Sequence, residues 1–208
     1  MAEIIIIGCG PGSPDYLTPM ARKTALEADV LIGSPKLIKL FPESTAERIE
    51  VTRSLVAVDH IRSRMGKAKK IAVLVSGDPG ISSMAKPVIR NFGAENCRVI
   101  PGISSVQFAF AKVGLEWSSA RIITAHKSDP SEDITEIARE NKVAVLAGRQ
   151  GALVWISRLA DAMGDNLDVF VCENLSMPDE KISKLTPAEL KGYVAPSMTI
   201  VLLIKRAA

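Results

Sequence analysis

The stretch IIIIGCGPGSPDYLT, residues 4–18, places four consecutive isoleucines directly before a segment rich in glycine and proline. A short run of β-branched residues predicts a buried strand, and the glycines after it predict a tight turn. The residues from Pro19 onward then show a helical period. A strand, a turn and a helix in this order form the βα unit of a largely parallel sheet.

The glycine spacing in this stretch argues against a phosphate-binding loop. Dinucleotide sites need G-x-G-x-x-G leading straight into a helix, whereas the spacing here is G-x-G-x-G with Pro11 inside it. Proline removes a backbone N–H donor, and Pro14 delays the helix. Asp29 precedes the second expected strand instead of following it, and no G-K-[ST] motif occurs. The turn therefore suits a nucleotide-like ligand without phosphates, a description that S-adenosylmethionine meets.

The rest of the chain repeats this alternation of short apolar strands and longer helical segments, which predicts an α/β fold. The polar segment GLEWSSAR at 114–121 is the best linker, so we expect an N-terminal α/β domain over 1–116 and a C-terminal one over 117–208. Hairpin-like spacing near the end predicts a mixed second sheet after a largely parallel first one. Strands are expected at 4–8, 30–33, 48–51, 71–75, 98–100, 121–124, 143–146, 169–172, 181–184 and 198–204, and helices at 19–27, 35–40, 55–65, 84–92, 104–113, 134–139, 152–163 and 187–191.

Three glycine-bearing loops each follow a strand of the first half: GCGPGS from Gly8, SGDPG from Ser76 and PGISS from Pro101. Parallel strands present their C-terminal ends at one edge of a sheet, so these loops should meet over a shared ligand-binding crevice. In the second loop, Asp78 can accept hydrogen bonds from ribose hydroxyls or face the cationic part of the ligand. The alternative role for Asp78 is to cap its own loop by bonding the backbone.

Composition narrows the class of protein. With 208 residues, 47% of them hydrophobic, the chain is long enough to bury one large or two small α/β cores. The formal charge of +3 is spread along the chain, which favours a small anionic substrate over nucleic acid. The three cysteines lack CxxC or Cys/His spacing, so neither disulfides nor a metal site is expected. The apolar run 4–7 is too short for a membrane span, and a cytoplasmic location fits best.

Four segments together resemble the tetrapyrrole methylases, the class III methyltransferases that use S-adenosylmethionine. They are GCGPGSPDYLTPMA from Gly8, LVSGDPGI from Leu74, VIPGISSVQFAFAKVGLEW from Val99 and VFVCENLSMPDEKI from Val169. The last two look like the branch of anaerobic cobalamin biosynthesis that methylates C5, a meso carbon, of cobalt-precorrin-7. The resemblance implies two α/β domains with the active site in a trough between them, and a homodimer.

The resemblance also implies a donor site. Carried over position by position, it places S-adenosylmethionine along Pro11, Gly77, Asp78, Ile81, Ser104, Ser105, Ala147 and Pro196. Ala147 stands where relatives often carry a larger residue, so only backbone contacts to the adenosine are expected there. Some relatives fuse this unit to a C-terminal methyltransferase that methylates C15 and decarboxylates an acetate arm. We expect that second activity on a separate polypeptide.

Two residues are candidates for proton transfer. His126 lies in TAHKSD after an expected strand and is of the residue type most used for proton transfer, and Glu173 ends the strand DVFVCEN. An ordinary loop or turn role stays open for both. The other histidine, His60, lies in an apolar helical pattern and is interpreted as structural. Corrin precursors carry many carboxylates, so cations near the loop mouths should bind them, and our candidates are Lys36, Arg53, Lys127 and Arg149.

Two other classes of function stay open from the sequence. A methylase of the same fold can act on another tetrapyrrole, on ribosomal RNA or on a modified histidine of a translation factor. RNA recognition favours aromatic residues among basic ones, and only 4% of the chain is aromatic. A nicotinamide-dependent reductase or a noncatalytic nucleotide sensor is the alternative of a different class. The broken glycine fingerprint counts against the reductase.

Overall fold

The computed structural model describes residues 2–149 and 151–206, which form two compact units that divide between Ser104 and Ser105. Helix α5 (Ser105–Lys112) belongs to the second unit because it contacts strand β10 (Thr199–Lys205). The expected linker at 114–121 lies later in the chain than this division. The domain boundary after residue 116 stays a prediction.

The first unit is built on the strands β1 (Glu3–Gly8), β2 (Val30–Gly33), β3 (Glu47–Glu50), β4 (Lys70–Val75) and β5 (Cys97–Ile100). They form one sheet in the order β3-β2-β4-β1-β5, and every neighbouring pair is parallel. The predicted parallel sheet is confirmed. Because β4, β1 and β5 are neighbours, the three glycine-bearing loops leave adjacent strands at one edge.

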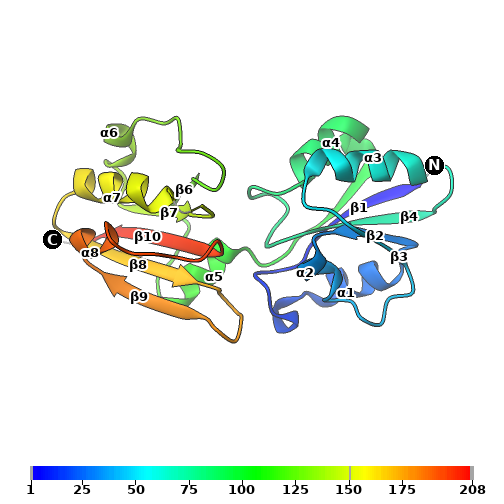
Figure 1. The fold of residues 1–208 in the computed structure, drawn as a ribbon, viewed down its shortest axis with the longest axis horizontal. Coiled ribbons are helices and arrows are strands. Elements are labelled where there is room, and N and C mark those ends of the chain that lie inside the picture. The colour runs from blue at the N-terminus through cyan, green and yellow to red at the C-terminus, as the bar shows by residue number, and fades with distance from the viewer. Residues whose placement is uncertain (1, 150, 207–208) are drawn as a thin grey trace. The chain divides into compact units, whose positions relative to one another are not determined.

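Four helices cover this sheet: α1 (Pro19–Leu26), α2 (Pro35–Ile38), α3 (Ser54–Arg64) and α4 (Ala85–Phe92). Figure 1 shows α3 and α4 over one face and α1 and α2 over the other. Ile4 and Ile6 of β1 pack with α3 and α4, whereas Ile5 and Ile7 pack with α1 and α2. This double burial explains why β1 is apolar at successive positions, without polar alternation.

The second unit is built on β6 (Arg121–Thr124), β7 (Lys142–Leu146), β8 (Leu167–Glu173), β9 (Lys181–Leu185) and β10. The strand order is β6-β7-β10-β8-β9. Only the β6–β7 pair of this sheet is parallel, so the predicted mixed sheet is confirmed. The central strand is β10, which pairs with both β7 and β8.

The helices that follow α5 are α6 (Ile134–Ile137), α7 (Ala152–Met163) and α8 (Pro187–Leu190). Buried residues of these three helices join one core with the strands, and α7 supplies the largest share, including Trp155 and Ile156. Figure 1 shows α6 and α7 above the sheet. Thr186 and Glu189 form a capping box that starts α8.

Every expected strand and helix is present, with ends within two residues of those expected. Two single-turn 3-10 helices, η1 (Pro14–Tyr16) and η2 (Ala94–Asn96), were not expected. η1 lies between the first loop and α1 in the chain, and α1 begins only at Pro19. The late start of this helix, predicted from Pro14, is therefore confirmed. No helix within 2–149 and 151–206 is both long and apolar enough to cross a bilayer.

Candidate functional site

The first two loops are joined backbone to backbone where β1 and β4 end. Gly77 N–H donates to Gly10 O at 2.7 Å, and Gly10 N–H donates to Gly77 O at 3.3 Å. Both residues have positive φ, 72° at Gly10 and 64° at Gly77, which glycine adopts without steric cost. The two loops therefore need no side chain to hold them together.

The third loop closes on the same point. Gly102 N–H donates to Asp78 Oδ2 at 3.2 Å. A Cβ on Gly102 would lie 2.4 Å from Gly77 O and 2.7 Å from Gly8 O, and a Cβ on Gly8 would lie 2.6 Å from Gly102 N. Neither position has room for a side chain. The predicted meeting of three loops at one edge of the sheet is confirmed.

Asp78 links two of these loops. Its Oδ1 accepts the N–H of Gly80 at 2.8 Å within its own loop, and its Oδ2 accepts from Gly102 in the next. The alternative considered for Asp78, capping of its own loop, is therefore observed. Ile81 N–H donates to the Asp78 carbonyl at 3.2 Å. The Asp78 carboxylate is half-buried and keeps further lone pairs, so it can still accept bonds from a ligand.

The other candidates of the first unit lie at the same edge. Pro11 is buried in the first loop, and Ser104 is buried just after the third. Lys36 and Arg53 are exposed, shortly after the ends of β2 and β3. Ser105 begins α5 in the second unit. Contact of these residues with a donor or substrate stays a prediction.

The candidates of the second unit also gather at one edge of their sheet. β6, β7 and β8 end there, and β10 begins there because it runs antiparallel to β7 and β8. Ala147 N–H donates to Thr199 O at 2.9 Å, which fixes the loop after β7 to the start of β10. The candidates at this edge are His126, Lys127, Ala147, Arg149, Glu173 and Pro196.

Glu173 has a partner that the sequence did not reveal. Tyr193 donates its hydroxyl to Glu173 Oε2 at 2.7 Å, and Lys181 Nζ donates to the Tyr193 hydroxyl at 3.0 Å. The bond to Tyr193, together with the charge of Glu173, raises the pKa of Lys181. No motif marks this contact, because Tyr193 lies 20 residues after Glu173. Asn174, next to Glu173, takes a turn role, with φ of 47° and an amide bond to Asp179 at 2.7 Å.

His126 and Arg149 lie in neighbouring loops. His126 is exposed, and its ring covers Gly148, where a Cβ would lie 1.4 Å from His126 Nδ1. Arg149 forms an ion pair with Asp129, which also lies 3.5 Å from Arg158. The Nε atom of Arg149 is buried, without a hydrogen-bond partner among the described residues. Because Asp129 already neutralises Arg149, its role toward a substrate carboxylate stays a prediction.

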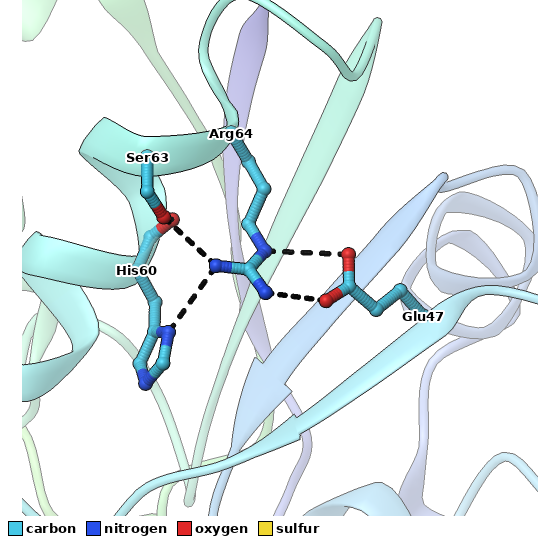
Figure 2. A network of polar contacts seen from close by, with 4 residues as sticks. All are labelled: Glu47, His60, Ser63 and Arg64. Carbon is cyan, nitrogen blue, oxygen red and sulfur yellow. Dashed lines mark hydrogen bonds and ion pairs between the residues drawn. The ribbon is translucent and has the colours of Figure 1, made fainter.

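A hollow of about 600 Å³ lies at the opposite edge of the first sheet, where β2 and β3 begin. Arg64 of α3 lines this hollow, and its Nε donates to Glu47 Oε2 at 3.3 Å, a contact shown in Figure 2. The guanidinium also donates to Ser63 Oγ at 2.8 Å and lies 3.3 Å from His60 Nδ1. The bond from Arg64 lowers the pKa of Glu47. His60 thus belongs to a structural network, in agreement with its interpretation from the sequence.

Asp29 lies at the same end of the first sheet as this hollow. Its Oδ2 accepts the backbone N–H groups of Lys70 at 2.8 Å and Lys69 at 2.7 Å, and these bonds lower the pKa of Asp29. The carboxylate therefore joins the start of β2 to the start of β4. It lies away from the three loops, as its position before the strand predicted.

The three cysteines are free thiols with different surroundings. Burial raises the pKa of Cys9 and of Cys172 to about 12. Burial also raises the pKa of Cys97, but this side chain is only half-buried, on the edge strand β5.

The thiolate is the reactive form, so a disulfide reagent at pH 8 should modify Cys97 first. Peptide mass spectrometry checks this order, and fast labelling of Cys9 in the folded protein would contradict it.

Several curated relatives match over most of the chain. The "Probable cobalt-precorrin-7 C(5)-methyltransferase" of Methanocaldococcus jannaschii is 34% identical, over 86% of this chain and 87% of that protein. The "Cobalt-precorrin-7 C(5)-methyltransferase" of Salmonella typhimurium is 28% identical, over 96% of this chain and 98% of that protein. The decarboxylating "Precorrin-6Y C(5,15)-methyltransferase" of Mycobacterium tuberculosis is 29% identical, over 86% of this chain but 45% of that protein.

Solved structures share the fold. The methyltransferase CobJ superposes with a TM-score of 0.82 at 19% identity, covering 100% of this chain and 97% of that chain. The uroporphyrin-III C-methyl transferase of Thermus thermophilus, complexed with S-adenyl homocysteine, gives 0.80 at 20% identity, with 98% and 92% covered. The family model described as "Tetrapyrrole (Corrin/Porphyrin) Methylases" matches residues 3–191, a range that includes the three loops and most of the second sheet. The chain belongs to the tetrapyrrole methylase family.

Proposed function

We propose that this protein transfers a methyl group from S-adenosylmethionine to C5 of cobalt-precorrin-7, a corrin intermediate of anaerobic cobalamin biosynthesis. The observation that carries the proposal is the meeting of three glycine-bearing loops in a chain of this family. Two relatives named for this reaction cover 86% and 96% of the chain. Family membership favours methyl transfer over the nicotinamide-dependent reductase and the nucleotide sensor.

The hydrogen bonds within the three loops suit a methyl donor that carries no phosphate. Gly10 and Gly77 use their N–H groups on each other, and Gly102 uses its N–H on Asp78. These three backbone N–H groups therefore form hydrogen bonds within the loops and are not directed at a phosphate. Carbonyl and carboxylate oxygens remain as acceptors for ribose hydroxyls and an ammonium group. The proposed donor contacts are Pro11, Gly77, Asp78, Ile81, Ser104, Ser105, Ala147 and Pro196.

S-adenosylmethionine supplies a methyl group that is already activated for displacement. The protein's own residues have to hold donor and acceptor carbon in line and to exclude water. Among the candidates for accepting a proton, His126 is exposed at its loop, whereas Glu173 is buried and bonded to Tyr193. We therefore place His126 first for this role.

The substrate's acetate and propionate groups are proposed to meet cations at the sheet edges. Lys36, Arg53 and Lys127 are exposed there and can bind carboxylates by charge-assisted hydrogen bonds. Arg149 would have to exchange its pairing with Asp129 for such a contact. We also propose a homodimer and a cytoplasmic location.

The direct test uses donor labelled with carbon-13 in the methyl group. We expect the protein to transfer this label to cobalt-precorrin-7, and carbon NMR of the product should place it at C5. Calorimetry should show binding of S-adenosylmethionine and S-adenosylhomocysteine and none of NADH. Label on another carbon would assign a different tetrapyrrole methylation, and failure to bind the donor would refute the proposal as a whole.

A further inference from the structure

A tyrosine and a buried glutamate tie the segment that carries Pro196 to the end of β8. Tyr193 donates its hydroxyl to Glu173 Oε2 at 2.7 Å, and only 7% of the Glu173 side chain is exposed. Lys181 Nζ donates to the same hydroxyl at 3.0 Å and lies 3.8 Å from Glu173 Oε2. The hydroxyl thus acts as donor and acceptor at once, which fixes its orientation.

The segment 193–198 has little apolar burial of its own. Val194, Pro196 and Ser197 are exposed, and 78% of Val194 is accessible to solvent. Tyr193 and Ala195 are half-buried and pack against the second core. A segment with few buried contacts opens easily, so single hydrogen bonds decide how well it is ordered.

The far end of this segment is already fixed by two hydrogen bonds. Thr199 Oγ1 donates to Pro196 O at 2.8 Å, and Asn174 N–H donates to Met198 O at 2.9 Å. The Tyr193 hydroxyl supplies the corresponding side-chain tie at the near end. The near end of the segment is thus attached to the end of β8 through Glu173. The far end is attached to Asn174, just after β8, and to Thr199 at the start of β10.

We propose that Tyr193, acting through Glu173, is a positioning residue for the methyl donor. The inference rests on the proposed function, in which Pro196 and Ala147 contact S-adenosylmethionine. Ala147 N–H is bonded to Thr199 O, so the segment held by Tyr193 runs directly into the strand start beside Ala147. Freeing the segment increases the entropy lost when the donor binds, and affinity falls without any change at the reacting atoms.

The test is Tyr193→Phe, which removes the hydroxyl and keeps the ring in the core. We expect calorimetry to show donor affinity about tenfold weaker, the size of effect expected from losing one hydrogen bond to a charged group. Binding is measured well below the melting temperature, and hydrogen exchange of the Val194 and Ser197 amides should become faster. If the wild-type protein binds the donor and Tyr193→Phe binds it equally well, the positioning role of Tyr193 is overturned. The proposed function is then unaffected.

A matched control lies at the other end of β8. Asp168 accepts from Lys184 Nζ at 3.0 Å and from Arg206 Nε at 2.8 Å, so it too joins β8 to neighbouring segments through a carboxylate. Asp168→Asn should leave donor affinity unchanged, because it does not touch the segment 193–198. An equal loss of affinity in Asp168→Asn and Tyr193→Phe would overturn the inference, since general loosening of the unit would then explain both.

Two changes at Glu173 separate positioning from proton transfer. Glu173→Gln keeps an oxygen that can accept from Tyr193, whereas Glu173→Ala removes it. A positioning role predicts that the glutamine variant retains donor affinity and that the alanine variant loses affinity like Tyr193→Phe. A glutamine variant that loses donor affinity like the alanine variant would overturn the positioning role, and turnover measured beside affinity reports proton transfer separately. A wild-type protein that binds no donor would refute the proposed function itself.

Discussion

Replacing Gly102 with alanine is expected to abolish detectable donor binding and to destabilise the first unit. The new Cβ would lie 2.4 Å from Gly77 O and 2.7 Å from Gly8 C, and both are backbone atoms that no rotamer change can move. Overpacking of this kind costs about 1–3 kcal/mol in the free energy of unfolding. For a unit of about 100 residues this lowers Tm by roughly 10 °C. Scanning calorimetry and titration with S-adenosylmethionine measure the two effects.

Gly66→Ala is the matched control for this substitution. Gly66 follows α3, and a Cβ there would have nothing within 4 Å. The control should keep both the melting temperature and the donor affinity of the wild type. If Gly102→Ala also bound the donor normally, the three loops would not form the donor site, and the proposed function would lose its structural basis.

Removing the Asp78 carboxylate should weaken donor binding far more than it lowers stability. Its two backbone partners, Gly80 and Gly102, are not fully buried and can bond to water in Asp78→Ala. We therefore expect about 1 kcal/mol or less of lost stability. Losing a charged acceptor for the donor costs about 1.5–3 kcal/mol, which is roughly a ten- to hundredfold change in affinity. Titration calorimetry beside thermal unfolding separates the two quantities.

Asp29→Ala controls for the loss of an aspartate that holds backbone N–H groups. Asp29 accepts from Lys69 and Lys70 at 2.7 and 2.8 Å, but at the opposite edge of the same sheet. It should lose stability at least as much as Asp78→Ala and retain full donor affinity. Unchanged affinity in Asp78→Ala would remove this residue from the donor site and leave it with its capping role.

The two sheets could be predicted because their strands carry strong local signals. The run Ile4–Ile7 is apolar at every position, which occurs when both faces of a strand are covered. The strand Arg121–Thr124 and the helix Ala152–Met163 have the bounds that their periodicity predicted. The meeting of the three loops could be predicted because each loop follows a strand of one parallel sheet. The structure adds that β4, β1 and β5 are neighbours.

Contacts between distant residues could not be predicted. The bridge between Gly10 and Gly77 and the bond from Tyr193 to Glu173 depend on the exact approach of separate elements. Periodicity and composition carry no information at that scale. The contact of α5 with β10, which places α5 in the second compact unit, is of the same kind, because it joins segments far apart in sequence.

The central place of β10 has a consequence for how the protein is made. The first sheet draws its five strands from residues 3–100, so it can close while the ribosome is still adding the rest. In the second sheet, β10 separates β7 from β8, and both therefore leave the ribosome with an open inner edge. The second unit can complete its sheet only after the final strand has been synthesised. Until then, a nascent chain with a finished first half carries two strands, β7 and β8, that each lack a partner along one edge. Such open edges favour aggregation and chaperone binding.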